Sequence, residues 1–253
     1  MMNQTTALIT GAAHGIGAAC IQDLAAQGIR HFILLDKDQA ALEVLAERYP
    51  DLECHLLCTD LSQPETFQTE LPLLLSQLPP LQVVVNNAGT AQENEPDDWH
   101  NWRKILALNL DAPFLIGAIC IPYLQEGASI INIASILGRA GKVRNSGYCA
   151  SKHGLLGYTK ALALDLAPRH IRVNAILPGW VDTPMLQREL QQQAQLLGMP
   201  DQKILRNARK QIPLRRFVLA EEVASMVAYL ASSAASAVTA QSFTIDGGFT
   251  CGM

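Results

Sequence analysis

Short apolar runs alternate with helical patterns along most of this chain. The runs LQVVVN (81–86), SIINI (129–133) and IRVNAIL (171–177) are largely apolar at successive positions, so both faces of each strand are expected to be covered. Strands of this kind that alternate with helices form a parallel sheet with right-handed crossovers. The sequence therefore predicts an α/β fold, a three-layer doubly wound parallel sheet, with strands at 6–10, 31–36, 53–57, 81–86, 129–133, 171–177 and 242–245 and helices that include 16–27, 39–48, 65–77 and 221–230.

No composition break or Gly/Ser-rich linker divides the chain, so we predict a single domain over residues 1–253. The alternation is interrupted at about 183–216 by a Gln-rich, charged segment that precedes the last helix. An insertion beyond the carboxyl end of a strand is well placed to cover a ligand. We expect this segment to cover the substrate, and a solvated pair of surface helices is the alternative.

The charge balance and the cysteines exclude several kinds of partner. A net charge of −4 provides no basic surface for nucleic acid and no polybasic membrane anchor. The apolar stretch 113–124 contains two prolines and is too short to span a bilayer, and residues 1–6 lack the cationic start of a secretory signal. The six cysteines form no C-x-x-C pair. We therefore expect reduced thiols, no metal, no nucleic acid, no membrane and a cytoplasmic location.

A glycine-rich turn, TGAAHGIG (10–17), joins the first strand to the first helix. Its glycines permit a tight turn and a close approach of the backbone, and the free N–H groups of the helix start favour a diphosphate. This is the dinucleotide site of a Rossmann fold. Asp36 ends the second strand, where a carboxylate can bind an adenosine ribose and repel a 2′-phosphate. The cofactor is therefore predicted to be NAD, with NADP less favoured; Lys37 is a possible counterweight, and a strand-end cap is the alternative role for Asp36.

Tyr148 and Lys152 stand four residues apart in GYCASKHG, which on a helix places them on one face about one turn apart. A free tyrosine has a pKa of about 10 and is a poor base at neutral pH. A lysine charge at roughly 4 Å, with an effective dielectric of about 20, stabilises the phenolate by about 4 kcal/mol, which would bring the phenol pKa to about 7. The pair therefore predicts a site of proton transfer.

Six sequence elements follow one another along the chain: TGAAHGIG (10–17), Asp60-Leu61 after the third strand, NNAG (86–89), Asn109 in LALNLDAPF, Ser135 with YCASK (148–152), and PGWVDTPM (178–185). In these elements and their order the chain resembles the short-chain dehydrogenase/reductase family along essentially its whole length.

The resemblance implies the roles of the matching residues. Ser135 would hydrogen-bond the substrate oxygen, Tyr148 would exchange the proton, and Lys152 would lower the tyrosine pKa and hold the nicotinamide ribose. Asn109 would anchor a water that passes the proton toward solvent. The catalytic residues implied are thus Asn109, Ser135, Tyr148 and Lys152. The cofactor-binding residues predicted from the turn, from Asp36 and from the resemblance are Gly11, His14, Gly15, Ile16, Gly17, Asp36, Asp60, Leu61, Asn87, Ala88, Gly89, Tyr148, Lys152, Pro178, Gly179, Val181 and Thr183.

The segments after Ser135 and after Pro178-Gly179 hold the candidates for the substrate pocket. Arg139, Lys142 and Arg144 could receive an anionic group, which suggests a hydroxy acid or another anionic alcohol, and a solvated basic loop is the alternative. The predicted substrate residues are Ser135, Leu137, Asn145, Tyr148, Trp180 and Met185.

The leading function is an NAD-dependent oxidoreductase that interconverts a secondary alcohol and a ketone. An NADPH-dependent 3-oxoacyl or polyketide-type ketoreductase is the alternative. A non-catalytic dinucleotide-binding protein would be expected to lack part of the Asn, Ser, Tyr and Lys set, and all four are present. The resemblance also implies a homo-oligomer, expected to be a tetramer, and the apolar tail 249–253 would lie at its interface or pack within its own subunit.

Overall fold

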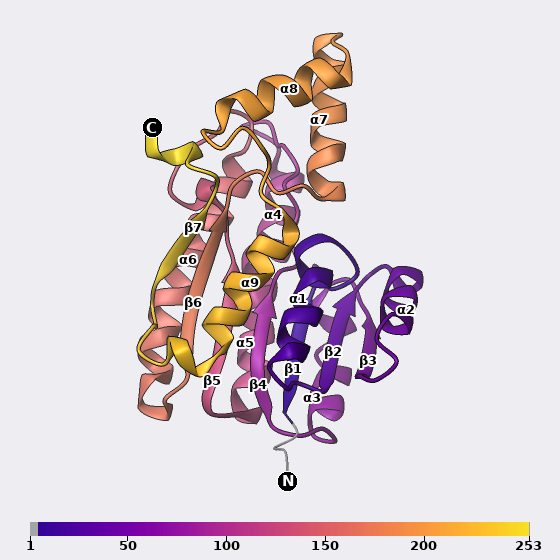
Figure 1. Ribbon diagram of the computed structural model, residues 1–253, viewed down its shortest axis with the longest axis vertical. Coiled ribbons are helices and arrows are strands. Elements are labelled where there is room, and N and C mark those ends of the chain that lie inside the picture. Colours follow the sequence, from indigo (N-terminus) through magenta and orange to yellow (C-terminus); the bar gives the residue numbers. More distant parts are fainter. Residues whose placement is uncertain (1–4, 253) are drawn as a thin grey trace.

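Seven parallel strands form one sheet in the order β3-β2-β1-β4-β5-β6-β7 (Figure 1). The chain builds outward from β1 to β3, then crosses back and builds β4 to β7 on the other side. The carboxyl ends of β1 and β4 therefore flank the point where strand order reverses, which is where open α/β sheets bind ligands. The computed structural model describes residues 5–252. The strands are β1 (Thr6–Thr10), β2 (His31–Asp36), β3 (Glu53–Cys58), β4 (Leu81–Asn86), β5 (Leu124–Ile133), β6 (Arg172–Pro178) and β7 (Ser242–Ile245).

Helices cover both faces of this sheet. Successive residues of a strand enter different cores: Val83 and Val85 of β4 pack in the core with α1 and α9, whereas Val84 packs in the core with α5 and α6. The predicted three-layer doubly wound parallel sheet in a single domain is confirmed. One face carries α1 (Gly15–Ala26), α2 (Gln39–Glu47) and α9 (Ala220–Ala231), and the other carries α3 (Glu70–Leu75), α5 (Ala112–Cys120) and α6 (Ser146–Leu166), with α4 (Trp99–Leu106) packed on α6.

Two elements differ from the sequence-based prediction. The helix predicted over 65–77 is a 3₁₀ turn, Pro64–Thr66, followed by the short α3. The Thr66 hydroxyl donates to the Gln63 carbonyl at 2.7 Å, which stabilises a turn in place of a longer helix. Strand β5 begins at Leu124, five residues before the predicted start, because Leu124 pairs with Leu81 of β4. Tertiary pairing extends the strand across a polar stretch that interrupts its apolar pattern.

The segment predicted as an insertion forms two helices, α7 (Pro184–Leu197) and α8 (Asp201–Gln211). They stand beyond the carboxyl ends of the strands, at the top of Figure 1. Thr183 caps the start of α7, Pro184 occupies its first turn, and Gly198 ends it with a φ of 60°. A small apolar cluster that includes Leu190, Ile204 and Phe217 holds the pair together.

The helices α4 and α5 join through a π-helical turn, Ala107–Asp111, into one helical stretch, Trp99–Tyr123. Among the described residues this is the one helix long and apolar enough, by length and composition alone, to cross a membrane, with a mean hydropathy of 1.8. Pro113 lies in the first turn of α5, where a proline is tolerated. Ile105, Ile116 and Cys120 of this stretch are buried within the protein, whereas Phe114 is 54% exposed.

Candidate active site

The glycine-rich turn lies between β1 and α1, at the reversal point of the sheet. Gly11 and Gly15 have positive φ angles of 63° and 54°, which other residues adopt at a cost. A Cβ on Gly17 would lie 2.2 Å from the Gly11 carbonyl oxygen, so only glycine fits there. His14 precedes α1, and its side chain accepts no hydrogen bond from the first N–H groups of the helix. These groups include the N–H groups of Ile16 and Gly17, two of the predicted cofactor residues. The turn is therefore built to bring backbone N–H groups close to an anion.

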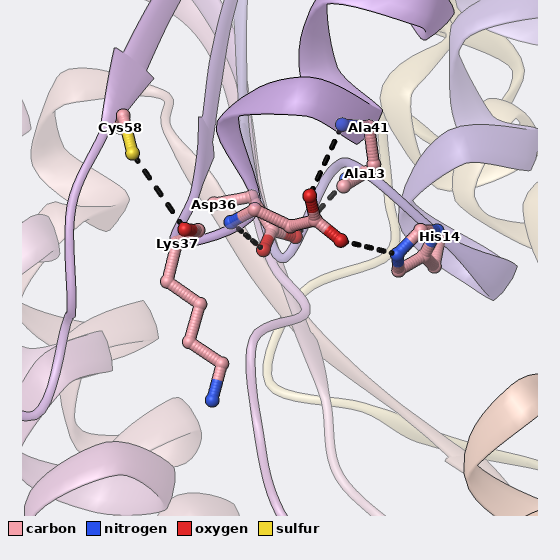
Figure 2. A network of polar contacts seen from close by, with 7 residues as sticks. Ala13, His14, Asp36, Lys37, Ala41 and Cys58 are labelled. Atoms are coloured by element: carbon pink, nitrogen blue, oxygen red, sulfur yellow. Dashed lines mark hydrogen bonds and ion pairs between the residues drawn. The ribbon is translucent and has the colours of Figure 1, made fainter.

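Asp36 lies at the end of β2, beside this turn (Figure 2). Its Oδ2 accepts the Ala13 N–H at 3.0 Å, and its Oδ1 accepts the Asp38 N–H at 3.1 Å. Asp38 in turn lies 3.1 Å from the Nε2 atom of His14 and caps α2. Figure 2 shows the Lys37 side chain pointing away from the Asp36 carboxylate. Two acids therefore stand at or just after the strand end, and the possible role of Lys37 toward a 2′-phosphate stays a prediction.

The segment after β4 closes the other side of the same crevice. The Thr10 hydroxyl accepts the N–H groups of Asn87 and Ala88, both at 3.0 Å, and the Asn87 amide donates to the carbonyls of Thr10 at 3.0 Å and Gly11 at 2.9 Å. A Cβ on Gly89 would lie 3.2 Å from Asn109 Oδ1 and 3.6 Å from Lys152 Nζ. This segment therefore joins the glycine-rich turn to the catalytic candidates.

Asp60 and Leu61 follow β3 at the same end of the sheet. The Asp60 carboxylate accepts the backbone N–H and the hydroxyl of Ser62 at 3.0 and 2.7 Å. Leu61 is buried and lines a small hollow together with Thr10 and Ala88. Both predicted residues thus flank the crevice beside the strand that carries Asp36.

Ser135, Tyr148 and Lys152 come together from the end of β5 and the first turns of α6. Tyr148 hydrogen-bonds with Ser135, whose hydroxyl also accepts the Leu137 N–H at 3.1 Å. Lys152 is buried, and its Nζ atom lies 5.8 Å from the centroid of the Tyr148 ring and donates to the Ile133 carbonyl at 2.9 Å. The phenol and the serine hydroxyl can therefore contact one oxygen atom of a ligand, with the lysine on the side of the β5 backbone.

Asn109 is completely buried in the π-helical turn between α4 and α5. Its amide donates to the Thr90 carbonyl at 2.9 Å and to the Ser151 hydroxyl at 3.1 Å, and its Oδ1 accepts the Thr90 N–H at 2.8 Å. Single π-helical turns inside α-helices are frequent at functional sites. Here the turn directs a polar side chain into the protein, where it ties the segment after β4 to α6.

The segment after β6, Pro178 to Thr183, faces the glycine-rich turn. A Cβ on Gly179 would lie 2.7 Å from Asp246 Cβ, so this glycine allows close packing on the segment after β7. Val181 is buried and forms a bridge with Val218. A Cβ on Gly15 would lie 3.0 Å from Thr183 Cγ2, which places Thr183 next to the start of α1. The predicted cofactor residues of this segment thus share one crevice with those of β1 and β4.

The comparisons with known proteins identify the family. A family model described as "Enoyl-(Acyl carrier protein) reductase" matches residues 11–250. A putative ketoacyl reductase of the monensin polyketide synthase from Streptomyces virginiae is 36% identical, over 98% of both chains. The chain belongs to the short-chain dehydrogenase/reductase family. It is an oxidoreductase of the type that acts on CH–OH groups, and a nicotinamide cofactor is implied by the fold.

Three further relatives carry the names of dehydrogenases or reductases. A D-beta-hydroxybutyrate dehydrogenase from Cupriavidus necator is 32% identical over 98% of this chain and 99% of its own. A variant of actinorhodin polyketide ketoreductase, solved with NADPH, superposes with a TM-score of 0.91 at 30% identity, covering 98% of each chain. Levodione reductase superposes with a TM-score of 0.89 at 29% identity, covering 99% of each chain. These relatives act as dehydrogenases and as ketoreductases on the same fold.

The titration of the tyrosine–lysine pair differs from the sequence-based prediction. Burial raises the pKa of Tyr148 to about 12, although the hydrogen bond with Ser135 acts in the opposite direction. Burial also lowers the pKa of Lys152 to about 8. The expected phenol pKa near 7 is therefore not reached in the protein chain alone, because desolvation outweighs the hydrogen bond with Ser135.

The predicted substrate residues separate into two groups. Leu137 is partly exposed next to Ser135, and Met185 is 40% exposed in the first turn of α7, so both are available to a substrate. Asn145 is 1% exposed, and its amide donates to the Val143 carbonyl at 2.9 Å. Trp180 packs against Phe217 and Phe249, with ring centroids 6.2 and 5.6 Å away.

Two of the three basic residues between Ser135 and Tyr148 have partners within the chain. Arg144 pairs with Glu93 at 3.2 Å and with Glu95 at 2.8 Å. Arg139 donates to the Ser242 carbonyl at 3.3 Å. The prediction that these cations receive an anionic group is wrong for Arg144. Glu93 and Glu95, which lie much earlier in the sequence, pack against it in the folded chain and neutralise its charge.

One acidic residue near the phenol was missed from the sequence. Glu189 lies on α7 and is half-buried; its charge raises the pKa of Tyr148, and burial raises the pKa of its own carboxyl. Lys142 acts against that rise and Glu93 adds to it. The signal was present, since Glu189 follows Met185 by four residues and so shares its helix face. Thr90, Ser151 and Asp38 were also missed, because their contacts depend on tertiary packing.

Proposed function

We propose that this protein is an NAD-dependent oxidoreductase that interconverts a secondary alcohol and a ketone, with Tyr148 as the acid/base. The observation that carries the cofactor preference is the pair of acids, Asp36 and Asp38, at the end of β2. A carboxylate at this place can accept hydrogen bonds from an adenosine ribose and repels a 2′-phosphate. The relative solved with NADPH supports the alternative, an NADPH-dependent 3-oxoacyl or polyketide-type ketoreductase.

The residues present fit a dinucleotide. The turn at Gly11 and Gly17 leaves no room for a Cβ on the protein side, and the start of α1 offers N–H groups to a diphosphate. Asn87 and Ala88 are held by Thr10, and Thr183 lies beside Gly15. We assign the remaining predicted cofactor residues to the same crevice on this basis.

The bound cofactor supplies the hydride acceptor or donor and, when oxidised, a positive ring charge. The chain orients the alcohol and moves its proton. Ser135 donates a hydrogen bond to the substrate oxygen as negative charge develops there, and Tyr148 takes the proton as a phenolate that the positive ring charge would stabilise relative to the chain alone. Lys152, with a pKa of about 8, is mostly protonated at neutral pH and stabilises the phenolate. Asn109 holds the surrounding backbone through Thr90 and stays beside Lys152 through Ser151.

The cofactor is tested by initial rates with NADH and NADPH on one ketone substrate, each at several cofactor concentrations. The proposal predicts a larger kcat/KM with NADH. A larger value with NADPH would establish the ketoreductase alternative and remove the proposed role of Asp36.

We propose that the reacting end of the substrate is uncharged, as in a 3-oxoacyl or 3-hydroxyacyl thioester. Glu189 near Tyr148, together with the pairing of Arg144, disfavours a carboxylate at this place. The similarity to a hydroxybutyrate dehydrogenase favours a free 3-hydroxy acid as the second candidate. A comparison of kcat/KM for 3-oxobutanoate and its thioester of N-acetylcysteamine decides between them. If the reacting end of the substrate is uncharged, Glu189→Gln should raise activity on the free acid more than on the thioester.

We also propose a cytoplasmic homo-oligomer, with tetramer as the expected form. Phe114 on α5 is 54% exposed and Leu164 on α6 is 73% exposed, which would suit an interface along these two helices. Phe249 packs on Trp180 of its own subunit, and Met253 of the predicted tail lies outside the described residues. Light scattering tests this proposal, and a particle of 27.5 kDa at micromolar concentration would contradict it.

A further inference from the structure

The helix α8 and the segment that follows it concentrate positive charge on an otherwise acidic protein. Residues 203–216 contain six of the 19 lysines and arginines and no aspartate or glutamate, whereas the whole chain has a net charge of −4. The overall charge, on which the sequence analysis relied, therefore conceals a local basic surface. The six are Lys203, Arg206, Arg209, Lys210, Arg215 and Arg216.

Four of these cations surround a hollow of about 440 Å³, which we call the α8 groove. This volume lies within the range of small-molecule sites, about 300 to 1,000 Å³. Leu205 contributes the apolar part of the lining, and Gln202 adds an amide. The complete lining is Gln202, Leu205, Arg206, Arg209, Lys210 and Arg215.

Within residues 5–252, no ion pair involves the four cations of the α8 groove. Nearby Arg216, by contrast, pairs with Glu222 at 2.6 Å and does not line the groove. Like charges placed together repel one another and lower the stability of the fold. A site that carries this cost with no ion-paired counter-charge among the described residues is suited to an anionic ligand.

Two of the cations are held in position by contacts that leave their charge unpaired. The Arg209 guanidinium lies 5.1 Å from the centroid of the Phe217 ring, and the Arg215 guanidinium donates to the Lys210 carbonyl. Arg215 also has a positive φ of 57°, a strained conformation for a residue with a side chain. Such contacts order the two side chains before a ligand binds, so binding costs less conformational entropy. Phe217 packs in turn on Trp180, which follows the predicted cofactor residues Pro178 and Gly179.

We propose that the α8 groove binds the phosphate groups of an organic anion, and that it holds the phosphate-bearing carrier end of a 3-oxoacyl thioester whose ketone is reduced at Tyr148. Guanidinium groups match phosphate oxygens through paired hydrogen bonds, and a ligand with several phosphate groups can engage several cations at once, whereas a hydroxy acid with a single carboxylate would engage fewer. The assignment of the carrier rests on the proposed function. It is compatible with an uncharged reacting end, because the negative charge of the substrate then lies on α8 and not beside Glu189.

Calorimetric titration with coenzyme A tests the site directly, in the presence of saturating NADH so that the dinucleotide crevice is filled. The test variant is the double substitution Arg206→Gln with Lys210→Gln, and Lys203→Gln is the matched control on the same helix outside the lining. We expect the double variant to weaken binding about tenfold or more and the control to leave it unchanged. Equal weakening in both, or no binding to the wild-type protein, would overturn the proposal. The midpoint of thermal unfolding reports whether the variants remain folded.

A second titration with pyrophosphate separates a carrier from a free phosphate compound. Binding of both ligands supports the carrier assignment, whereas binding of pyrophosphate without coenzyme A overturns it. The kinetic readout is the ratio of KM for 3-oxobutanoyl-coenzyme A to KM for the N-acetylcysteamine thioester, which lacks phosphate. The double variant should raise this ratio about tenfold. Reduction of ketones without binding of coenzyme A would refute the proposed ligand of the α8 groove and leave the proposed function intact. Binding of coenzyme A without reduction of ketones would support the α8 groove as a binding site and contradict the proposed function.

Discussion

The substitution Asp36→Asn removes one charge at the end of β2 and keeps the shape of the side chain. The asparagine Oδ1 can still accept one backbone N–H of the two that Asp36 accepts now, from Ala13 and Asp38. If the 2′-phosphate of NADPH lies at roughly 5 Å from the carboxylate, the repulsion at an effective dielectric of about 20 is about 3 kcal/mol per unit charge. Asp36 is partly exposed, so we take about half of this, about 1.5 kcal/mol, which corresponds to about tenfold.

The assay is the ratio of kcat/KM for NADPH to kcat/KM for NADH, followed by nicotinamide absorbance at low and high salt. The ratio should rise about tenfold in Asp36→Asn, and by less at high salt, because screening weakens the repulsion in the wild type. The control is Asp38→Asn, which removes an equal charge two residues away and should have a smaller effect. The reasoning is refuted if the two variants shift the ratio equally, or if Asp36→Asn changes it less than about twofold.

Three further predictions concern the phenol, the glycine-rich turn and the start of α9. Tyr148→Phe removes the proposed acid/base and should lower kcat about 10²- to 10⁴-fold, with a much smaller change in the Kd for NADH; residual activity near the wild-type value would contradict its role. Gly17→Ala places a Cβ 2.2 Å from the Gly11 carbonyl oxygen, so we expect weaker NADH binding and a lower Tm, measured by fluorescence titration and thermal unfolding. Arg216 and the Leu219 N–H lower the pKa of Glu222 to about 2, so this acid contributes stability above its ordinary pKa that is lost as the pH falls toward 2. Because the pair is exposed, Glu222→Gln should lower the free energy of unfolding at pH 7 by only about 1 kcal/mol and should flatten its decline in acid, as denaturant titration at several pH values would show.

The strands and the pairing of Tyr148 with Lys152 could be predicted because their signals are local, whereas Asn109 and Ser135 were implied by the family resemblance. Val83 to Val85 are apolar in succession, and the spacing of Tyr148 and Lys152 sets their common helix face whatever packs around it. The extent of α3 and of β5 could not be predicted in this way. The first depends on side-chain hydrogen bonds around Thr66, and the second depends on the pairing of Leu124 with another strand.

The errors at the site share one physical cause, which is the environment that distant segments create. Arg144 was a candidate for a substrate anion until Glu93 and Glu95 were found beside it. The phenol pKa was predicted from one neighbouring charge, whereas burial of Tyr148 dominates in the folded chain. Desolvation and long-range ion pairs have no counterpart in the spacing of residues along a sequence.

The sequence by itself determined the order of strands and helices, the glycine-rich turn and the residue types available for proton transfer, because these follow from local periodicity and backbone freedom. Only the tertiary structure decided which charges meet. It placed Asp36 and Asp38 at the crevice, Glu189 near the phenol, and unpaired cations around a groove on α8. Electrostatic energies depend on distance and burial in three dimensions, so these features emerge only when the chain is folded.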